Sequence, residues 1–230
     1  VTPMDAHGFF NFSTTCSMTP TYCRKARKVV VEVNTLTPWC LGGLDETIHI
    51  SQVDMVVEGP NSRLVQLPEL EASEADRIIA NHVMGLLEDG STIQLGIGAL
   101  PNVVGAMIAR SGLKDLGVHT EMLADSYVDM YEAGRITGKH KGIDRGKMVY
   151  TFALGSQKLY DFLDNNHVAA IFPVSYTNDP NVIGSNPKVI AINNAIEVDL
   201  FSQVASESSG ARQISGTGGQ LDFIMGAHRS

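Results

Sequence analysis

The sequence predicts an α/β fold built on a mostly parallel sheet. Through the second part of the chain, short apolar segments alternate with segments of helical pattern. Residues 28–34, KVVVEVN, form a continuous β-branched run, which is typical of a strand buried in a parallel sheet. Residues 92–119 have the pattern of a strand, a glycine turn, a helix and a second strand, which together make one βαβ unit.

The composition is that of a folded protein. The chain has 230 residues, of which 43% are hydrophobic, so a core can form and disorder is not expected. The formal net charge is -8 and no basic run occurs, so we expect neither nucleic acid nor an anionic membrane surface as a partner. No apolar run approaches the ~20 residues that a membrane-spanning helix needs.

The cysteines and histidines indicate reduced thiols and no metal site. Cys16, Cys23 and Cys40 are odd in number and contain no C-x-x-C pair, which favours free thiols and a cytoplasmic location. The seven histidines show neither the H-x-x-x-H nor the H-E-x-x-H spacing. Val1 is not a start methionine and no signal peptide follows it, so we expect the chain to be a piece of a longer protein.

The first region, up to residue 70, is predicted to hold short strands and one helix. The expected strands are 7–13, 28–34 and one or two within 49–58, and the expected helix is 19–28. Residues 67–71, LPELE, are predicted to be a linker.

A helix is predicted to open the second region at Ser73. Ser73 is a suitable N-cap, and acidic residues follow it in the first turn, where the helix dipole favours them. The pattern predicts that Gly90 ends this helix and that its buried stripe comprises Ile79, Val83 and Leu86.

The remaining elements follow the central βαβ unit. We expect helices at 126–134 and 157–163, strands at 149–154, 168–176 and 188–192, a polar loop at 139–147 and a turn-rich segment at 179–186. A glycine cluster, SGTGGQLDF, follows at 215–223.

The central unit provides the strongest functional signal. The first strand, Thr92 to Leu95, runs into Gly96-Ile97-Gly98, and the second ends on Thr120-Glu121. Ligands of open α/β sheets bind beyond the carboxyl ends of strands, so the glycine turn and Glu121 should face one crevice. The dinucleotide fingerprint is incomplete because Pro101 replaces its third glycine, and no G-K-[ST] follows. A plain tight turn and a close backbone approach to a ligand both remain open.

Several acidic and nucleophilic residues compete for a catalytic role. Glu121 follows a strand near glycine-rich segments, and a carboxylate can be a covalent nucleophile. Glu197 is the rival carboxylate, and Glu207 in a Ser-rich loop is a weaker one. His119 is expected to pack rather than to act as a base, and Ser126 lacks the G-x-S-x-G elbow of a serine hydrolase.

Several longer motifs together resemble a known family. GIGALPNVVG, LGVHTEM, VYTFALGSQKLYDFLDNN and SGTGGQLDF, with PMDAHGFFNF and HISQVDMVVEG, are similar to the acetyl-CoA hydrolase/transferase family, and most to its 4-hydroxybutyrate and butyryl-CoA:acetate CoA-transferases. The resemblance implies open, mostly parallel sheets with helices on both faces in two related α/β domains. Residues 1–70 would be the C-terminal part of the first domain, and 73–230 the N-terminal, catalytic part of the second.

The resemblance also assigns site residues. Glu121 would form a glutamyl-CoA thioester, whereas the family position that matches Glu197 need not be acidic. The residues expected to contact coenzyme A are Gly96, Ile97, Gly98, Ala99, Leu100, Ile196, Gly218 and Gly219.

The function implied is transfer of CoA between a short-chain acyl-CoA and a carboxylate such as acetate, in the metabolism of butyrate and other fatty acids. CoA would be a substrate and part of a covalent intermediate, with no permanently bound cofactor, and the full-length protein would be a homo-oligomer. Acyl-CoA hydrolysis is one alternative, and a non-catalytic CoA-binding fragment is another. The preferred acyl chain cannot be read from the sequence.

Overall fold

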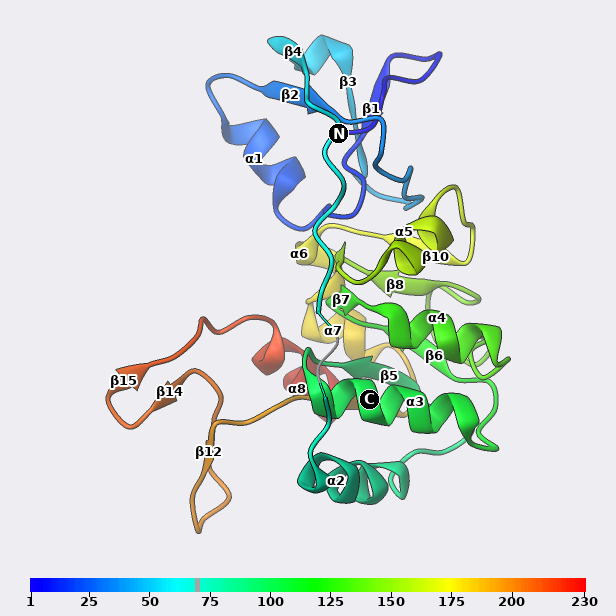
Figure 1. Cartoon of the computed structure of the whole chain (residues 1–230), viewed down its shortest axis with the longest axis vertical. Helices are drawn as coiled ribbons and strands as arrows, with labels where there is room; N and C mark the ends of the chain where they lie inside the picture. Colours follow the sequence, from blue (N-terminus) through cyan, green and yellow to red (C-terminus); the bar gives the residue numbers. More distant parts are fainter. Residues whose placement is uncertain (69–70) are drawn as a thin grey trace.

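The computed structural model describes residues 1–68 and 71–230. The predicted linker at 67–71 therefore lies partly outside the described residues. The first region contains the elements β1 (Phe9–Asn11), α1 (Thr19–Lys25), β2 (Val30–Val33), β3 (Thr47–His49), the 3-10 helix η1 (Ile50–Gln52) and β4 (Met55–Glu58). Strand β1 pairs antiparallel with β3, and β2 pairs parallel with β4 (Figure 1).

The strand predicted at 28–34 is present, but the expectation that it is buried was wrong. Only Val31 is buried in β2, where it packs in a small cluster with Phe10 and Ile48. Val30 is 57% exposed, and every side chain of β4 is exposed. The β2–β4 sheet has two strands, and among the described residues only Val31 of its eight side chains is buried, so an apolar run here does not produce a strand buried on both faces.

The second region is built on a parallel sheet. Its elements are α2 (Glu74–Met84), β5 (Thr92–Leu95), α3 (Ala99–Arg110), β6 (Gly117–His119), β7 (Met122–Leu123), α4 (Asp125–Glu132), β8 (Met148–Tyr150), β9 (Phe152–Ala153), α5 (Gln157–Leu163), β10 (Ala169–Ile171), α6 (Val174–Thr177), α7 (Pro180–Gly184), β11 (Val189–Ile192) and α8 (Gln220–His228). The strand order is β10-β8-β6-β5-β11, and every neighbouring pair is parallel. The predicted α/β class and parallel sheet are confirmed.

Helices cover both faces of this sheet, as the side chains of the edge strand β11 demonstrate. Val189 packs with Ile183 of α7 and Phe223 of α8. Ile190 and Ile192, which alternate with it, pack against the main core instead. Helices α3 and α4 pack against each other over that core, and Figure 1 shows them on the near side of β5 and β6.

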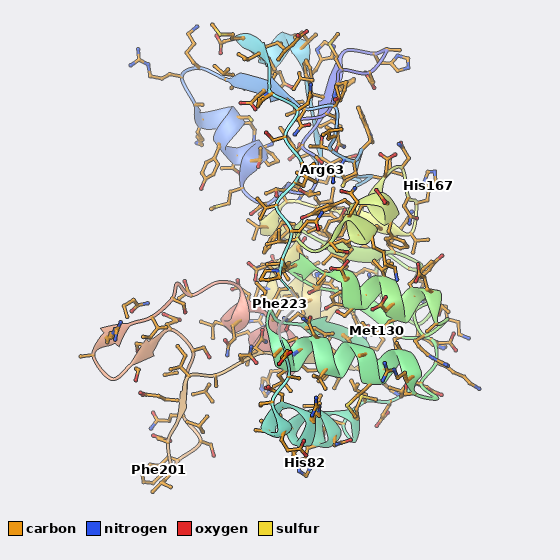
Figure 2. The ribbon with its side chains drawn as sticks, in the orientation of Figure 1. Arg63, His82, Met130, His167, Phe201 and Phe223 are labelled. Atoms are coloured by element: carbon orange, nitrogen blue, oxygen red, sulfur yellow. The ribbon has the colours of Figure 1, made fainter. Side chains whose placement is uncertain are left out.

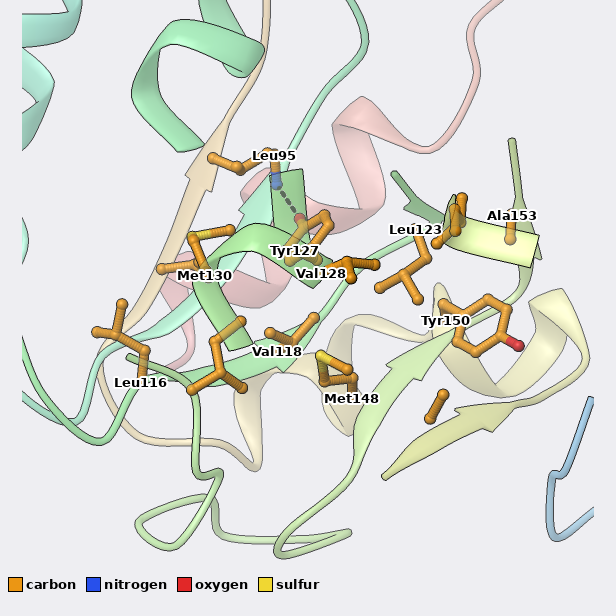
Figure 3. Packing of buried hydrophobic residues seen from close by; sticks show 14 of the residues in the cluster. Leu95, Leu116, Val118, Leu123, Tyr127, Val128, Met130, Met148, Tyr150 and Ala153 are labelled. Atoms are coloured by element: carbon orange, nitrogen blue, oxygen red, sulfur yellow. Dashed lines mark hydrogen bonds between the residues drawn. The ribbon is translucent and has the colours of Figure 1, made fainter. Parts of the chain in front are cut away.

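The main core fixes the end of β5 against α4. The backbone N–H of Leu95 donates a 2.7 Å hydrogen bond to the Tyr127 hydroxyl, which is fully buried (Figure 3). Around this pair lie buried aliphatic side chains from β6, α4 and β8, among them Val118, Val128, Met130 and Met148. The strand end that leads into the glycine turn is therefore held rigidly.

Several predicted details of the second region were wrong. Helix α2 ends at Met84 with Gly85 as its C-cap, not at Gly90. Of its predicted stripe, Ile79 and Leu86 are 46% and 68% exposed, and the buried residue is Ala80. Residues 149–154 contain the end of β8 and the whole of β9, 168–176 divide into β10 and α6 at Pro173, and the turn-rich segment contains α7. Ser73 caps α2 as predicted, with Asp76 completing a reciprocal capping box.

Between β11 and α8 the chain leaves the body of the protein as an arm. The arm contains two antiparallel ribbons, formed by β12 (Glu197–Val198) with β13 (Val204–Ala205) and by β14 (Ser208–Ser209) with β15 (Arg212–Gln213). Figure 2 places Phe201 at the far end of this arm and Phe223 in the body. No helix among the described residues is both long and apolar enough to cross a bilayer.

Candidate active site

The glycine turn lies at the carboxyl end of β5 and is held by amide side chains. Gly98 has φ +126°, a backbone conformation that side-chain-bearing residues rarely adopt, and it precedes the first turn of α3. The Asn194 side-chain amide donates a 2.8 Å hydrogen bond to the carbonyl of Ile97. The side-chain amides of Gln94, in β5, and Asn193, directly after β11, form a reciprocal pair of hydrogen bonds of 3.1 and 3.0 Å.

Glu121 lies beyond the end of the neighbouring strand β6. Its backbone carbonyl accepts hydrogen bonds from the N–H groups of Thr151 and Phe152, at 3.0 and 3.2 Å. Its carboxylate oxygen Oε2 accepts a 3.0 Å hydrogen bond from the backbone N–H of Gly219, which precedes α8. The positive end of the α8 dipole is therefore adjacent to this carboxylate.

These segments meet in one cavity of about 450 Å³. It is lined by the ends of β5 and β6, the residues after β11 and the glycine cluster: Gln94, Leu95, Gly96, Ile97, Glu121, Met122, Phe152, Asn193, Asn194, Ser206, Ser215, Gly216, Thr217, Gly218, Gly219 and Gln220. A cavity of about 510 Å³ lies between the first region and α5, but it contains none of the predicted site residues. The smaller cavity is therefore the candidate active site.

The surroundings of Glu121 raise its pKa above the ordinary value. Burial is the largest cause, and the negative charge of Asp222 acts in the same direction. Hydrogen bonding from the Gly219 N–H and from the Asn178 side chain opposes the increase, because both donors favour the ionised form. A partly desolvated carboxylate with few donors is less well solvated than a surface carboxylate, which makes it more reactive toward a carbonyl carbon.

Five of the nine predicted site residues line this cavity, namely Gly96, Ile97, Glu121, Gly218 and Gly219. Gly98, Ala99 and Leu100 lie on the adjoining turn and first turn of α3 but not on the cavity wall, and Leu100 packs against the main core. Ile196 lies at the base of the arm, where its N–H donates to the Ala205 carbonyl. Their contacts with CoA remain predictions.

The rival residues lie elsewhere. Glu197 is on the arm, where Ser209 Oγ and the Gly210 N–H donate to its carboxylate and lower its pKa. Glu207 is also on the arm and does not line the cavity. His119 is fully buried, and its Nε2 lies 2.8 Å from the Thr177 carbonyl oxygen, which supports its predicted packing role.

Sequence reasoning missed Asn178. This residue follows α6 at the carboxyl edge of the sheet, and its side chain is 8% exposed. A Cβ atom on Gly219 would overlap both Asn178 Nδ2 and Glu121 Oε2, so the three groups meet at one point. Only the position of Asn178 after a strand and a short helix could have drawn attention to it. Within residues 1–68 and 71–230, no group of three or more His, Cys, Asp or Glu side chains is arranged to hold a metal ion.

Comparison with known proteins identifies the family. Residues 1–68 match the acetyl-CoA hydrolase/transferase N-terminal domain, and residues 155–230 match the acetyl-CoA hydrolase/transferase C-terminal domain. The chain belongs to the acetyl-CoA hydrolase/transferase family. Within this family, the butyryl-CoA:acetate CoA-transferase of Anaerostipes caccae is 51% identical over 100% of this chain and 52% of its own length. The 4-hydroxybutyrate coenzyme A transferase of Clostridium kluyveri is 40% identical over the same shares.

A solved structure in the family has the same fold. The 4-hydroxybutyrate CoA-transferase of Porphyromonas gingivalis superposes with a TM-score of 0.87 and 36% identity, and the match covers 100% of this chain and 54% of that one. Acetyl-CoA hydrolases are more distant relatives; the one from Kluyveromyces lactis is 26% identical. The chain spans about half the length of the curated relatives that it matches.

Proposed function

We propose that the full-length protein transfers CoA between a short-chain acyl-CoA, such as butyryl- or 4-hydroxybutyryl-CoA, and a carboxylate such as acetate. Glu121 is the covalent nucleophile. The observation that carries the proposal is the Glu121 carboxylate, accepting the Gly219 N–H at 3.0 Å in a cavity that also contains the glycine turn. The transferase names of the relatives at 51% and 40% identity support it, and the hydrolases are more distant.

The first half of the reaction loads CoA onto the protein. The ionised carboxylate of Glu121 attacks the thioester carbonyl, the C–S bond breaks, and the CoA thiolate leaves a mixed anhydride of the acyl group and Glu121. The thiolate then attacks the glutamyl carbonyl carbon, and the first carboxylate leaves. A glutamyl-CoA thioester remains, and no external energy is needed because one activated acyl group replaces another.

The second half reverses these steps with a different acid. The acceptor carboxylate attacks the glutamyl carbonyl, and the thiolate leaves a second mixed anhydride. Attack of the thiolate on the acceptor carbonyl then gives the new acyl-CoA and restores the Glu121 carboxylate. The electron pairs balance in every step, and no redox partner is involved.

The roles of the protein groups follow from their geometry. Each attack on the glutamyl carbonyl places negative charge on one Glu121 oxygen. The N–H of Gly219, already 3.0 Å from Oε2, is positioned to stabilise that charge at the start of α8. The N–H groups of Thr151 and Phe152 hold the backbone carbonyl of Glu121, and this limits the positions that the carboxylate can take.

We also propose that the two regions belong to different α/β domains, 1–70 to the first and 73–230 to the second. The end of the N-terminal domain match at residue 68 supports this division.

The test uses the full-length protein and separates transfer from hydrolysis. Incubation with butyryl-CoA and acetate should yield acetyl-CoA and butyrate, whereas without acetate free CoA should accumulate only slowly. Rapid release of free CoA that does not depend on acetate would favour the hydrolase. CoA binding without either product would favour a non-catalytic protein and overturn the proposal.

A further inference from the structure

His119 is buried beside segments that carry three residues near the candidate site. The side chain is fully buried, and its Nε2 lies 2.8 Å from the Thr177 carbonyl oxygen. The next residue after Thr177 is Asn178, whose side-chain amide lies beside the Glu121 carboxylate: a Cβ atom on Gly219 would overlap both groups. His119 itself is two residues before Glu121, at the end of β6. The imidazole therefore connects the segment that carries the nucleophile with the segment that carries its amide donor.

Helix α8, which follows Gly219, also lies beside this ring. The Phe223 ring of α8 lies 6.2 Å from the His119 ring, centroid to centroid. The Phe223 N–H donates to the Gly219 carbonyl at 3.1 Å, so Phe223 belongs to the same helical turn as the backbone donor to Glu121. The His119 side chain therefore lies beside all three segments that carry Glu121, Asn178 and Gly219.

The chemistry of the contact fixes the state of the imidazole. A carbonyl oxygen only accepts hydrogen bonds, so Nε2 carries the proton. Burial lowers the pKa of His119 to about 4, and the ammonium group of Lys141 acts in the same direction, while the hydrogen bond to the Thr177 carbonyl and the charge of Asp144 oppose it. Nδ1 is buried and has no hydrogen-bond partner among the described residues. A neutral, buried ring whose one N–H is engaged by Thr177 has a geometric role rather than a proton-transfer role.

We propose that His119 is a positioning residue: its Nε2–H bond to the Thr177 carbonyl holds the Asn178 amide against the Glu121 carboxylate. Packing alone would need only a side chain of similar volume. Positioning needs a donor at Nε2, and this difference can be tested. The catalytic part of the inference rests on the proposed function, whereas the titration of Glu121 does not.

The experiment compares two substitutions in the full-length protein. His119→Gln keeps an N–H donor near the Nε2 position, and His119→Met has similar volume without a donor. Val118→Ala is the matched control, because Val118 is buried on the opposite face of the same strand and makes no side-chain hydrogen bond. Thermal melting identifies any variant that fails to fold.

Two readouts are measured for each variant. The first is the pH dependence of Glu121 modification by a water-soluble carbodiimide with an amine, followed by peptide mass spectrometry, which needs no enzymatic activity. Because the carbodiimide reacts with the protonated carboxyl group, His119→Met should shift this profile to higher pH. His119→Gln and Val118→Ala should leave it in place.

The second readout is CoA exchange. We expect His119→Met to lower kcat about 10- to 100-fold with KM for acyl-CoA nearly unchanged, which is the size of effect that a misplaced reacting group produces. His119→Gln should restore kcat to within a few-fold of the parent. Equal behaviour of the Gln and Met variants in the carbodiimide profile would overturn the positioning role. If the carbodiimide profiles differ as expected but the parent shows no exchange, the proposed function fails and the positioning role stands.

Discussion

The backbone N–H of Gly219 donates a 3.0 Å hydrogen bond to Oε2 of Glu121, although the two residues are 98 positions apart in the chain. The bond joins the carboxyl end of β6 to the start of α8. In the proposed mechanism, Oε2 is the oxygen that becomes negatively charged when the glutamyl carbonyl is attacked.

The first prediction concerns the nucleophile in the full-length enzyme. Incubation with acyl-CoA and no acceptor should leave CoA attached to Glu121, and borohydride should reduce that thioester to an alcohol, marked by peptide mass. Glu121→Gln should abolish exchange, because a neutral amide is a poor nucleophile. Glu121→Asp retracts the carboxylate by one methylene, and a displacement of ~1 Å can cost about 100-fold.

Glu197→Gln is the matched control for that experiment. Glu197 is a carboxylate on the arm and outside the cavity, so its loss should leave most of the exchange activity. A borohydride mark on Glu197, or full exchange by Glu121→Gln, would falsify the assignment.

The second prediction concerns Gly219. A Cβ atom there would overlap Glu121 Oε2 and Asn178 Nδ2, so Gly219→Ala should displace the carboxylate from its N–H donor. We expect kcat to fall about 100- to 1,000-fold, as when one oxyanion donor is removed. Gly112→Ala is the control, because Gly112 does not line the cavity and a Cβ there meets no atom within 4 Å. Equal activities of the two variants would contradict the role of Gly219.

The sequence could predict the part of this site that local pattern controls. The strand Thr92–Leu95, the Gly96–Gly98 turn and the residue that follows the next strand are all within one βαβ unit, so parallel pairing of β5 and β6 brings Glu121 beside the turn. The prediction that Gly219 belongs to the site came from the family resemblance, because local periodicity does not specify a contact between residues 98 positions apart. Asn178 was missed for the same reason.

Burial was harder to predict than secondary structure. The 3.6-residue pattern placed Ile79 and Leu86 on the inner face of α2, yet both are exposed. The helix packs on α3 and the main core through Ala80, Val83 and Met84, so the partner element decides which side of the stripe is covered. In β2, likewise, the composition indicated a central strand, but burial depends on covering layers that the run itself does not specify.

The third prediction concerns the glycine turn. Gly98→Val would force a β-branched residue into φ +126° and bring Cβ within 2.9 Å of Asn194 Nδ2, which holds the Ile97 carbonyl. We expect CoA binding to weaken by about tenfold or more while the sheet stays folded, measured by calorimetric titration and circular dichroism. Gly112→Val is the control, because its Cβ meets no atom within 4 Å. Unchanged CoA affinity of Gly98→Val would remove the turn from the binding site.

The last prediction concerns the pH dependence of exchange. In the proposed mechanism Glu121 attacks only when it is ionised, so kcat should decline as pH falls through the pKa of this group, which burial raises above the ordinary value. The Asn178 amide lies beside this carboxylate and lowers its pKa, which favours the ionised form. Asn178→Leu removes that donor and should raise the Glu121 pKa further, so the acid limb of the kcat profile should move to higher pH. Asn181→Leu is the control, because Asn181 lies on α7 outside the cavity and its side chain binds Arg229 instead. An acid limb at the parental pH in Asn178→Leu, or an equal shift in both variants, would show that the amide does not set the ionisation of Glu121.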